Sequence, residues 1–343
     1  MRLTYVPCLL VALLCLAPVL AEETAEVPAP ADAAPEAASE AASEAAQQEK
    51  ATEKPETPPV DYSQVKVMAY NVRNMFDVFD DPYTHDEQSP VKPRWELERI
   101  ATLIKKYDPD VIALTELENE WILKAIIHDW LGGRGYDHIT SLPSNDRRGI
   151  TIGVASRLPI HSVTSHRLRE LRLEGHTNKW QFARDLIRAR LWVAGRNQRH
   201  LDVYVAHFKS KRNVKGDERS RNWRLAEATA ARSIVDAGRR AVTRDWTLLV
   251  GDFNDTPDSE TLKALTDVVD GGPTPLLDVH AHLPPERRIT YLRGQFRSTI
   301  DYILASPDLA RRVVTESAYV PRDVRLLTGS DHAPVLAAFD LSF

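Results

Sequence analysis

The sequence predicts one α/β domain, with two β-sheets and helices outside them, over residues 61–343. Strand-like and helix-like stretches alternate along this region, which is typical of α/β proteins. Residues 110–114 form a short, continuously apolar segment, as expected for a strand that is buried on both faces. No internal repeat divides the region, and its length is compatible with a single large domain.

The individual elements follow from the spacing of the apolar residues. Residues 65–70 alternate and are rich in β-branched side chains, which predicts a strand, and apolar residues recur at helical spacing over 94–107. Further strands are predicted at 110–114, 150–155, 187–193, 201–206, 247–250, 299–304 and 335–339. Further helices are predicted at 119–131 and 219–240, and the long stretches 76–92 and 268–288 are interpreted as surface loops.

Residues 1–21 have the pattern of a secretory signal peptide that is cleaved after Ala21. Their apolar core is shorter than the roughly twenty residues that span a membrane. A lipoprotein signal is disfavoured, because bulky Leu14 precedes Cys15. The only two cysteines, Cys8 and Cys15, lie in this segment, so the mature chain is expected to have no thiol and no transmembrane segment. A secreted or periplasmic location, as in bacteria, is predicted.

Residues 22–60 consist almost entirely of Ala, Glu, Pro, Thr, Ser and Gln, which predicts a disordered linker. The formal charge of the whole chain is −5, which at first argues against a polyanionic substrate. The linker contains ten acidic residues and two basic ones, however. The remaining region, 61–343, therefore carries a small positive charge, and the objection to nucleic acid no longer holds.

Polar side chains collect where the predicted strands meet their loops. Single residues of this kind usually cap a helix or form a turn, and a lone histidine is more often structural. Glu116 is harder to explain in that way, because a carboxylate that closes an apolar strand is partly desolvated and needs a partner. The set as a whole points to chemistry, and it comprises Asn71, Glu116, His207, Asp252, Asn254, Asp301, Asp331 and His332.

The residue types of this set indicate metal-dependent hydrolysis of a phosphoester. Asn, Asp and Glu are hard oxygen ligands that suit Mg²⁺, or alternatively Mn²⁺ or Ca²⁺, rather than zinc. Two histidines beside such ligands supply a general base and a general acid or phosphate donor. The sequence has no HExxH zinc motif, no GxxxxGK[ST] phosphate-binding loop and no GxSxG nucleophile elbow.

Six short motifs follow one another along the chain: YNV at 70–72, LTE at 114–116, HFKSK at 207–211, GDFN at 251–254, TIDYIL at 299–304 and SDHAPV at 330–335. Together they resemble the endonuclease/exonuclease/phosphatase superfamily, which includes pancreatic-type deoxyribonuclease, the abasic-site endonuclease, neutral sphingomyelinases and inositol phosphatases. The resemblance covers residues 65–340. It implies a four-layer α/β sandwich, with two mixed β-sheets packed face to face and helices outside, and a site where the loops of both sheets meet.

The resemblance also implies roles for the polar residues. Glu116 matches the principal Mg²⁺ ligand of the family, with Asn71 beside it as a ligand or phosphate contact. Asp331 matches a residue that completes a metal site in many members. His332 matches the base that activates water, and Asp301 matches the carboxylate that orients it.

The remaining roles concern the nucleophile and the phosphate. Asp252 and Asn254 match the pair that positions them, and family accounts differ over whether the Asp can itself be the base. His207 matches the phosphate-facing donor or the general acid. Arg184 resembles the family's phosphate-contacting arginine, and Lys209, in the HFKSK motif, is assigned to phosphate binding with it.

Two positions depart from the family pattern. Thr115 stands where Gln usually precedes the metal-binding Glu, and Tyr70 stands where Trp or Phe is common. Neither change removes a catalytic group, and the chain is expected to be an active enzyme.

The predicted substrate is nucleic acid, with DNA preferred, and the motifs look most like the secreted bacterial nuclease branch. Residues 209–224 contain seven basic residues against two acidic ones, a strip that could follow a phosphate backbone. Lys211, Arg212 and Lys215 are the backbone contacts predicted from it, although a solvated helix face is the plainer interpretation. No module for reading base edges is visible, so little sequence specificity is expected. A monomer without a stable protein partner is predicted.

Two other functions remain open at this point. One is a phosphatase or phosphodiesterase acting on a small or lipid-linked phosphoester, like an inositol phosphatase or a sphingomyelinase. The other is a binding module that holds metal without turnover. The sequence does not decide between DNA and RNA, between endonuclease and exonuclease action, or between one metal and two.

Overall fold

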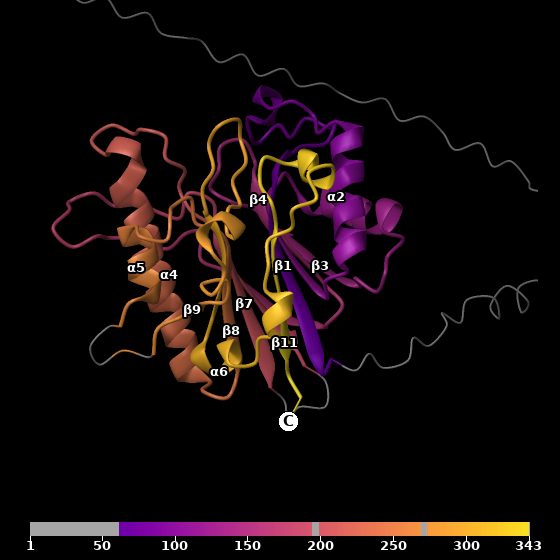
Figure 1. Ribbon diagram of the computed structural model, residues 1–343. Helices are drawn as coiled ribbons and strands as arrows, with labels where there is room; N and C mark the ends of the chain where they lie inside the picture. The colour runs from indigo at the N-terminus through magenta and orange to yellow at the C-terminus, as the bar shows by residue number, and fades with distance from the viewer. Residues whose placement is uncertain (1–61, 194–198, 269–271, 273, 343) are drawn as a thin grey trace, which may run out of the picture. The chain divides into compact units, whose positions relative to one another are not determined.

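The computed structural model describes residues 62–193, 199–268, 272 and 274–342 (Figure 1). The predicted signal peptide at 1–21 and the predicted linker at 22–60 lie outside the described residues, so these two segments stay predictions.

The first sheet is mixed and has five strands, namely β1 (Gln64–Met75), β2 (Val111–Leu117), β3 (His138–Leu142), β4 (Thr151–Ser156) and β11 (Val335–Asp340). Their order across the sheet is β11-β1-β2-β4-β3, and only the β1–β2 pair is parallel. At the beginning of β1, Gln64 pairs with Asp340, and the Leu341 N–H donates to the Ser63 carbonyl at 2.6 Å. The two ends of the described domain are therefore neighbours.

The second sheet has six strands, namely β5 (Ile160–Ser165), β6 (Leu186–Trp192), β7 (His200–His207), β8 (Trp246–Asp252), β9 (Leu277–Asp278) and β10 (Asp301–Ala305). Their order is β5-β6-β7-β8-β10-β9, with β7 and β8 parallel and the other pairs antiparallel. This sheet is mixed as well.

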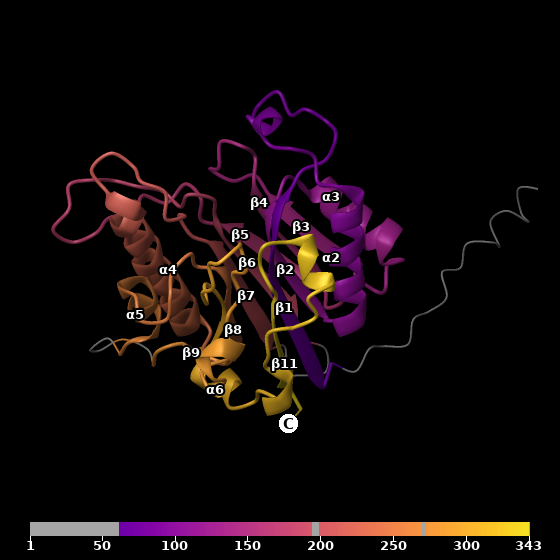
Figure 2. The same ribbon diagram turned by 45° about the horizontal axis from the view of Figure 1, so that its top comes forward.

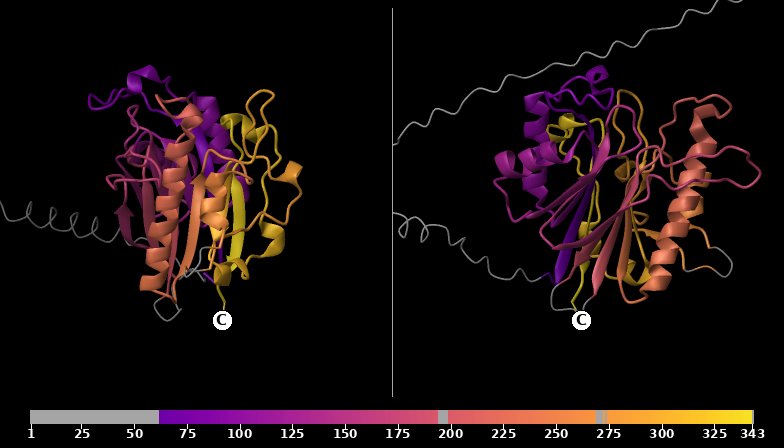
Figure 3. Two further views of the ribbon diagram at one scale, coloured as in Figure 1. Left: turned by 90° about the vertical axis from the view of Figure 1, so that its left-hand side faces the viewer. Right: turned by 180° about the vertical axis from the view of Figure 1, so that it is seen from behind.

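The two sheets pack face to face between two layers of helices (Figure 3). One hydrophobic cluster joins them, with Val67 and Leu114 from the first sheet and Val203 and Leu248 from the second. The helices beside the first sheet are α2 (Arg94–Tyr107) and α3 (Glu120–Ala125), which continues as a π-helical turn at Ile126–Trp130 (Figure 2). Beside the second sheet lie α4 (Arg221–Ala241) and α5 (Glu260–Thr266), and a short helix, α6, spans Pro307–Ala310. The predicted four-layer sandwich is confirmed.

Helix α2 has the bounds that the sequence predicts. Its buried residues Ile100, Leu103 and Ile104 recur at helical spacing on one face. The helix ends at Asp108, whose backbone is left-handed with a φ of 45°, a conformation in which the N–H closes the last turn on Ile104.

Several boundaries differ from the predictions. Strand β10 begins at Asp301 rather than at residue 299, and β1 runs on to Met75. Strands β3 and β5 and helix α5 were not predicted, and the stretch 268–288 contains β9 as well as loop. No helix within the described parts of the chain is long and apolar enough to cross a membrane.

Candidate active site

Strand register brings most of the predicted polar residues to one end of the sandwich. In the second sheet, Asp252 at the end of β8 pairs with His207 at the end of β7 and with Asp301 at the start of β10. In the first sheet, Asn71 pairs with Thr115 next to Glu116, where the ladder between β2 and β4 is irregular. Because β10 is antiparallel to β8, a residue that begins one strand lies beside a residue that ends the other.

Asn71 connects the two halves of the site across the sandwich. Its Nδ2 donates to Glu116 Oε1 at 3.2 Å in its own sheet and to Asp252 Oδ2 at 3.0 Å in the other sheet. Its Oδ1 accepts from the Arg73 N–H at 2.9 Å. The amide is buried, so these contacts fix its orientation.

The backbone around Glu116 adopts conformations that side chains disfavour. Glu116 has a φ of 67°, and Arg73 and Asn74 have φ values of 50° and 45°. The Asn74 N–H donates to Glu116 Oε2 at 2.8 Å, so the bulge in β1 holds this carboxylate directly. Strained backbone of this kind often marks functional positions, because the surrounding structure must enforce it.

The GDFN segment requires glycine at position 251, because the backbone of β7 passes very close to it. Gly251 has a φ of 126°, and a Cβ at this position would lie 2.1 Å from the carbonyl oxygen of Ala206 in β7. The next residue, Asp252, accepts from the Asn254 N–H at 2.8 Å, and Asn254 Nδ2 donates to the Phe208 carbonyl at 3.0 Å. Asn254 is thereby bonded to the last residue of β8 and to the residue that follows β7.

His332 and Asp301 form a buried pair. The distance between His332 Nδ1 and Asp301 Oδ2 is 2.8 Å. The other ring nitrogen, Nε2, lies 4.0 Å from Asp331 Oδ1, and the ring of Tyr291 packs edge-on against the imidazole at 5.1 Å. Burial lowers the pKa of His332, but the charge and hydrogen bond of Asp301, together with Asp252 and Asp331, outweigh burial and raise it to about 10.

Asp252 and His207 are buried beside each other. His207 Nε2 lies 3.6 Å from Asp252 Oδ2 and 3.9 Å from Glu116 Oε1. Burial and the negative charge of Asp301 raise the pKa of Asp252 to about 7. Burial and the positive charges of Arg184, His332 and Arg148 hold the pKa of His207 well below its ordinary value. A neutral His207 suits the role of hydrogen-bond donor better than that of general acid.

These groups face an open cleft of about 1480 Å³. Ten arginine or lysine residues line it against five aspartate or glutamate residues, so its walls favour a polyanion. Asn71 and Asp301 lie directly behind this lining through their contacts with Asp252 and His332. The predicted residues that line the cleft are Glu116, Arg184, His207, Lys209, Lys211, Arg212, Asp252, Asn254, Asp331 and His332.

The predicted phosphate and backbone contacts differ in their surroundings. Arg184 is buried, with Nε 3.1 Å from Asp146 Oδ2, and Lys209 Nζ lies 4.8 Å from the centre of the Trp223 ring. Lys211 Nζ pairs with Asp255 at 2.6 Å, whereas Arg212 is exposed in the lining. Lys215 is exposed and lies outside the lining of the cleft.

Sequence reasoning missed several residues that hold the site together. Asp146 pairs with both Arg184 and Arg148, and fully buried Glu227 on α4 accepts hydrogen bonds from two loops of the site. Asp146 gave no signal in the sequence. Glu227 could have been noticed as an acid on the otherwise Ala-rich buried face of a helix.

The donor atoms of the site fit a divalent cation. Glu116, Asp252 and Asp331 supply carboxylate oxygens to the cleft. Asn71, predicted as a ligand or phosphate contact, instead turns its amide nitrogen toward Glu116 and Asp252, while its oxygen accepts from the Arg73 N–H. The hydrogen bonds to Glu116 come from neutral groups, the Asn71 amide and the Asn74 N–H, which leaves its charge for a cation. Asp252, Asp301 and His332 also have ligand atoms within 4.8 Å of one another.

The fold and the site define an α/β-sandwich hydrolase of the phosphoesterase and nuclease class. The chain belongs to the endonuclease/exonuclease/phosphatase family, whose model matches residues 66–329. No curated protein matches the sequence significantly.

Solved structures share the fold. The human Nocturnin catalytic domain with bound sulfate anion has a TM-score of 0.57 and 18% identity, covering 82% of this chain and 96% of that one. An endonuclease/exonuclease/phosphatase from Bacteroides vulgatus has a TM-score of 0.57 and 17% identity, covering 81% and 99%. An AP endonuclease from Archaeoglobus fulgidus has a TM-score of 0.54 and 21% identity, covering 81% and 100%.

Proposed function

We propose that this protein is a Mg²⁺-dependent phosphodiesterase that hydrolyses nucleic acid, preferably DNA, with little sequence specificity. The observation that carries the proposal is the open cleft, in which ten basic side chains surround the group of carboxylates and histidines. Basic walls of this kind neutralise backbone phosphates without reading bases. A small phosphoester needs no such extended wall. A secreted or periplasmic location is proposed from residues 1–21 alone.

Glu116 and Asp331 are the residues that would hold the cation, and Asn71 would orient the Glu116 carboxylate through its amide nitrogen. When bound, the cation would supply positive charge to the phosphate oxygens as negative charge develops on them. The Glu116 carboxylate is positioned to bind the cation by its left-handed backbone and by the hydrogen bond from the Asn74 N–H.

His332 is the residue proposed to accept the proton of the attacking water. This role requires the form of the protein in which the His332 ring is neutral, a small fraction at pH 7 because the pKa of His332 is raised to about 10. Because Nδ1 is engaged by Asp301, only Nε2 is available to the substrate. Asp252, fixed by Asn254 and Asn71, would orient the water, and its pKa of about 7 keeps it available as an alternative base. The donors to the phosphate would be His207 Nε2 and the side chains of Arg184 and Lys209.

The structural relatives support this proposal. One of them is described as an AP endonuclease, and another structure holds a sulfate anion. Sulfate, like phosphate, is a tetrahedral oxyanion.

The proposal is tested by giving the purified protein four substrates, each with Mg²⁺ and with chelator. They are supercoiled plasmid, RNA, sphingomyelin and a nitrophenyl phosphate. We expect nicking of the plasmid that requires Mg²⁺ and that His332→Ala reduces by at least about a hundredfold, the scale of acid–base catalysis. Hydrolysis of one of the small substrates with no effect on plasmid or RNA would reject the nuclease function in favour of a small-phosphoester hydrolase. Tight Mg²⁺ binding without turnover of any substrate would indicate a binding module.

A further inference from the structure

The loop between Tyr291 and Ser298 begins and ends at the candidate active site. Tyr291 and Ser298 pair through their backbones, and the Leu292 N–H donates to the Asp331 carbonyl at 2.8 Å. Tyr291 also forms a backbone bridge with His332, whose ring it contacts. The base of the loop is therefore fixed relative to the residue proposed to handle the proton.

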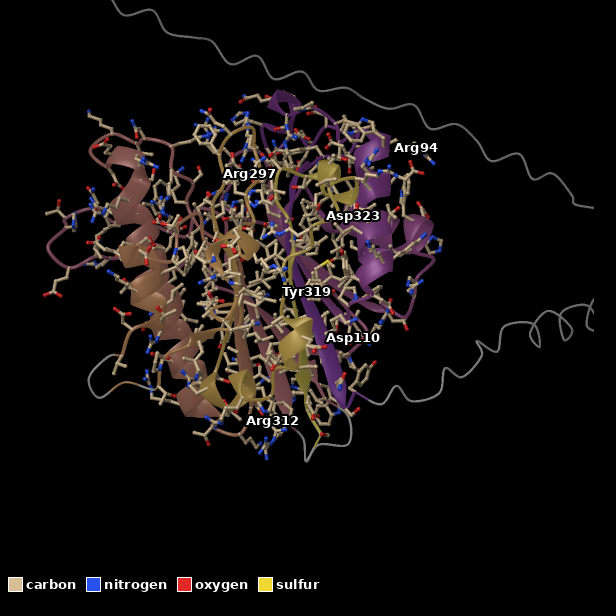
Figure 4. The ribbon with its side chains drawn as sticks, viewed as in Figure 1. Arg94, Asp110, Arg297, Arg312, Tyr319 and Asp323 are labelled. Atoms are coloured by element: carbon tan, nitrogen blue, oxygen red, sulfur yellow. The ribbon has the colours of Figure 1, made fainter. Side chains whose placement is uncertain are left out.

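The tip of the same loop is closed by hydrogen bonds from one arginine. The Arg297 guanidinium donates to the carbonyls of Leu292, Gly294 and Phe296 at 2.8, 2.6 and 2.9 Å. The Phe296 N–H closes a turn on the Arg293 carbonyl at 2.9 Å. Figure 4 shows Arg297 at one end of the molecule and Arg312 at the other, where β8 begins. The backbone that carries Phe296 is thus held by hydrogen bonds at the end of the molecule where the cleft lies.

Phe296 is exposed to an extent of 63% and lines the cleft. Among the described residues, the other large apolar side chains that are strongly exposed lie outside the cleft lining. Trp180 and Trp223 add two half-buried aromatic rings to the lining, and the indole N–H of Trp223 donates to the Gln181 carbonyl at 2.8 Å. The cleft therefore offers flat apolar surfaces between its basic side chains, which a phosphate backbone alone would not need.

We propose that Phe296 is a stacking platform for an unpaired nucleobase next to the scissile phosphate, so that single-stranded or locally unpaired nucleic acid is the favoured substrate. This inference rests on the proposed nuclease function. An unpaired base offers its π-face to an aromatic side chain whatever its identity. In a duplex these faces are covered by neighbouring bases, and only the edges are open in the grooves. The basic residue Arg293 in the same loop is placed to contact the adjoining phosphate.

The test compares binding of a labelled single strand with binding of the same strand in a duplex, in chelator so that no hydrolysis occurs. The variants are Phe296→Ala, which removes the ring, Phe296→Leu, which keeps apolar bulk, and Phe296→Trp, which keeps a ring. Phe79→Ala is the matched control, because Phe79 is 78% exposed but lies outside the cleft lining. All four are at exposed positions, and thermal unfolding of each checks that the fold is intact.

We expect Phe296→Ala and Phe296→Leu to weaken single-strand binding roughly tenfold, the scale of losing one stacked base, with little change for duplex. Phe296→Trp and Phe79→Ala should bind like the parent protein. Equal single-strand affinity for the parent and Phe296→Ala, or full retention by Phe296→Leu, would overturn the stacking subsite. Failure of the proposed function would be seen in the separate hydrolysis assay with Mg²⁺. The parent protein would then hydrolyse no nucleic acid, whichever residue stands at position 296.

Discussion

Glu227 shows how a single buried carboxylate can organise this site. Its Oε1 accepts from the Ala183 N–H at 2.7 Å and its Oε2 accepts from the Lys209 N–H at 2.6 Å. The first loop carries Arg184 and the second follows His207, so one side chain of α4 connects two proposed phosphate contacts. Burial raises the pKa of Glu227 to about 7, although both hydrogen bonds and two nearby arginines oppose the shift.

This raised pKa predicts a pH dependence of stability. Between its unfolded value of about 4.5 and the folded value of about 7, the folded state binds more protons at Glu227 than the unfolded state does. The contribution of Glu227 is therefore fully present below pH 4.5 and is lost as the pH rises through 7. Glu227→Gln should be less stable at pH 5, by about 1–3 kcal/mol for an unpaired buried N–H, with a smaller difference at pH 8.

Urea denaturation across this range measures the effect. The pKa values of Asp252 and Glu118 are also raised to about 7, so these groups contribute to the fall of the free energy of unfolding with pH as well. In Glu227→Gln this fall should therefore be shallower than in the parent protein, but not absent. Asp236→Asn on the same helix is the control, because its carboxylate pairs with Arg232 away from the site. If the free energy of unfolding of Glu227→Gln fell with pH as steeply as that of the parent protein, the raised pKa of Glu227 would be contradicted.

At the residue scale, sequence reasoning located the candidate site but not its supports. His207 and Asp252 stand out because polar residues follow apolar strands, and the register then pairs them. His332 stands out in the SDH motif that precedes the last strand, and it lines the same cleft. Glu227 and Asp146 contact the site from a helix and a loop that the chain alone does not place beside it. Such contacts depend on tertiary packing, which periodicity does not report.

A buried lysine contacts the bulge of strand β1. Lys92 Nζ donates to the carbonyls of Val72 and Arg73, each at 2.9 Å, and pairs with Glu96 at 2.7 Å. These carbonyls adjoin the left-handed residues that position Glu116. A segment predicted as a surface loop thus ends in a group that shapes the active-site strand.

Lys92→Met should destabilise the protein by about 3–5 kcal/mol, because it leaves the partly buried Glu96 carboxylate and two carbonyls without their partner. Activity should fall with it, since the bulge that holds Glu116 loses its support. Chemical denaturation and a plasmid-nicking assay measure the two effects. Lys106→Met, which removes an ion pair with Asp323 on the surface, should change neither. If the stability of Lys92→Met were unchanged, the bulge would form without the hydrogen bonds from Lys92.

At the scale of elements, the apolar pattern predicted the buried helices and strands and missed the partly exposed strands β3 and β5. Helix α2 was predicted with its observed bounds because one face is continuously buried. Strands β3 and β5 each lie at one edge of their sheet, and much of each is at least partly exposed. Strand β11, at the other edge of the first sheet, is almost wholly buried and was predicted. The polar composition of β3 and β5 gives little signal, because a strand that buries only part of one face alternates weakly.

For the whole molecule, the charge of the cleft predicts how salt affects binding. The fitted slope of log affinity against log salt should lose about 0.7–0.9 when one phosphate contact is removed. Arg212→Ala should show this loss, because Arg212 is exposed in the cleft lining. Lys215→Ala should keep the parent slope, although the sequence places both in one basic strip. An equal loss of slope in both variants would show that the whole strip, and not the cleft alone, binds the backbone, and the parent slope in both would remove Arg212 from the contacts.

The total charge was the least informative whole-chain property. It is the sum of an acidic segment at 22–60 and a slightly basic domain at 61–343. Counting the charges of each segment separately reveals this difference. How the basic residues are distributed between the cleft and the rest of the surface required the structure, since neighbours in the chain such as Arg212 and Lys215 face different surroundings.

Because the two ends of the domain are neighbours, the same fold could be built with the chain beginning at a different strand. Ser63 and Leu341 are already joined by a backbone hydrogen bond, at the end of β1 opposite the candidate site. A short peptide could connect them without crossing the cleft, and new ends could be opened in a surface loop. Circularly permuted forms of this protein would then carry a fused partner at a chosen side of the cleft, while the reacting groups keep their positions.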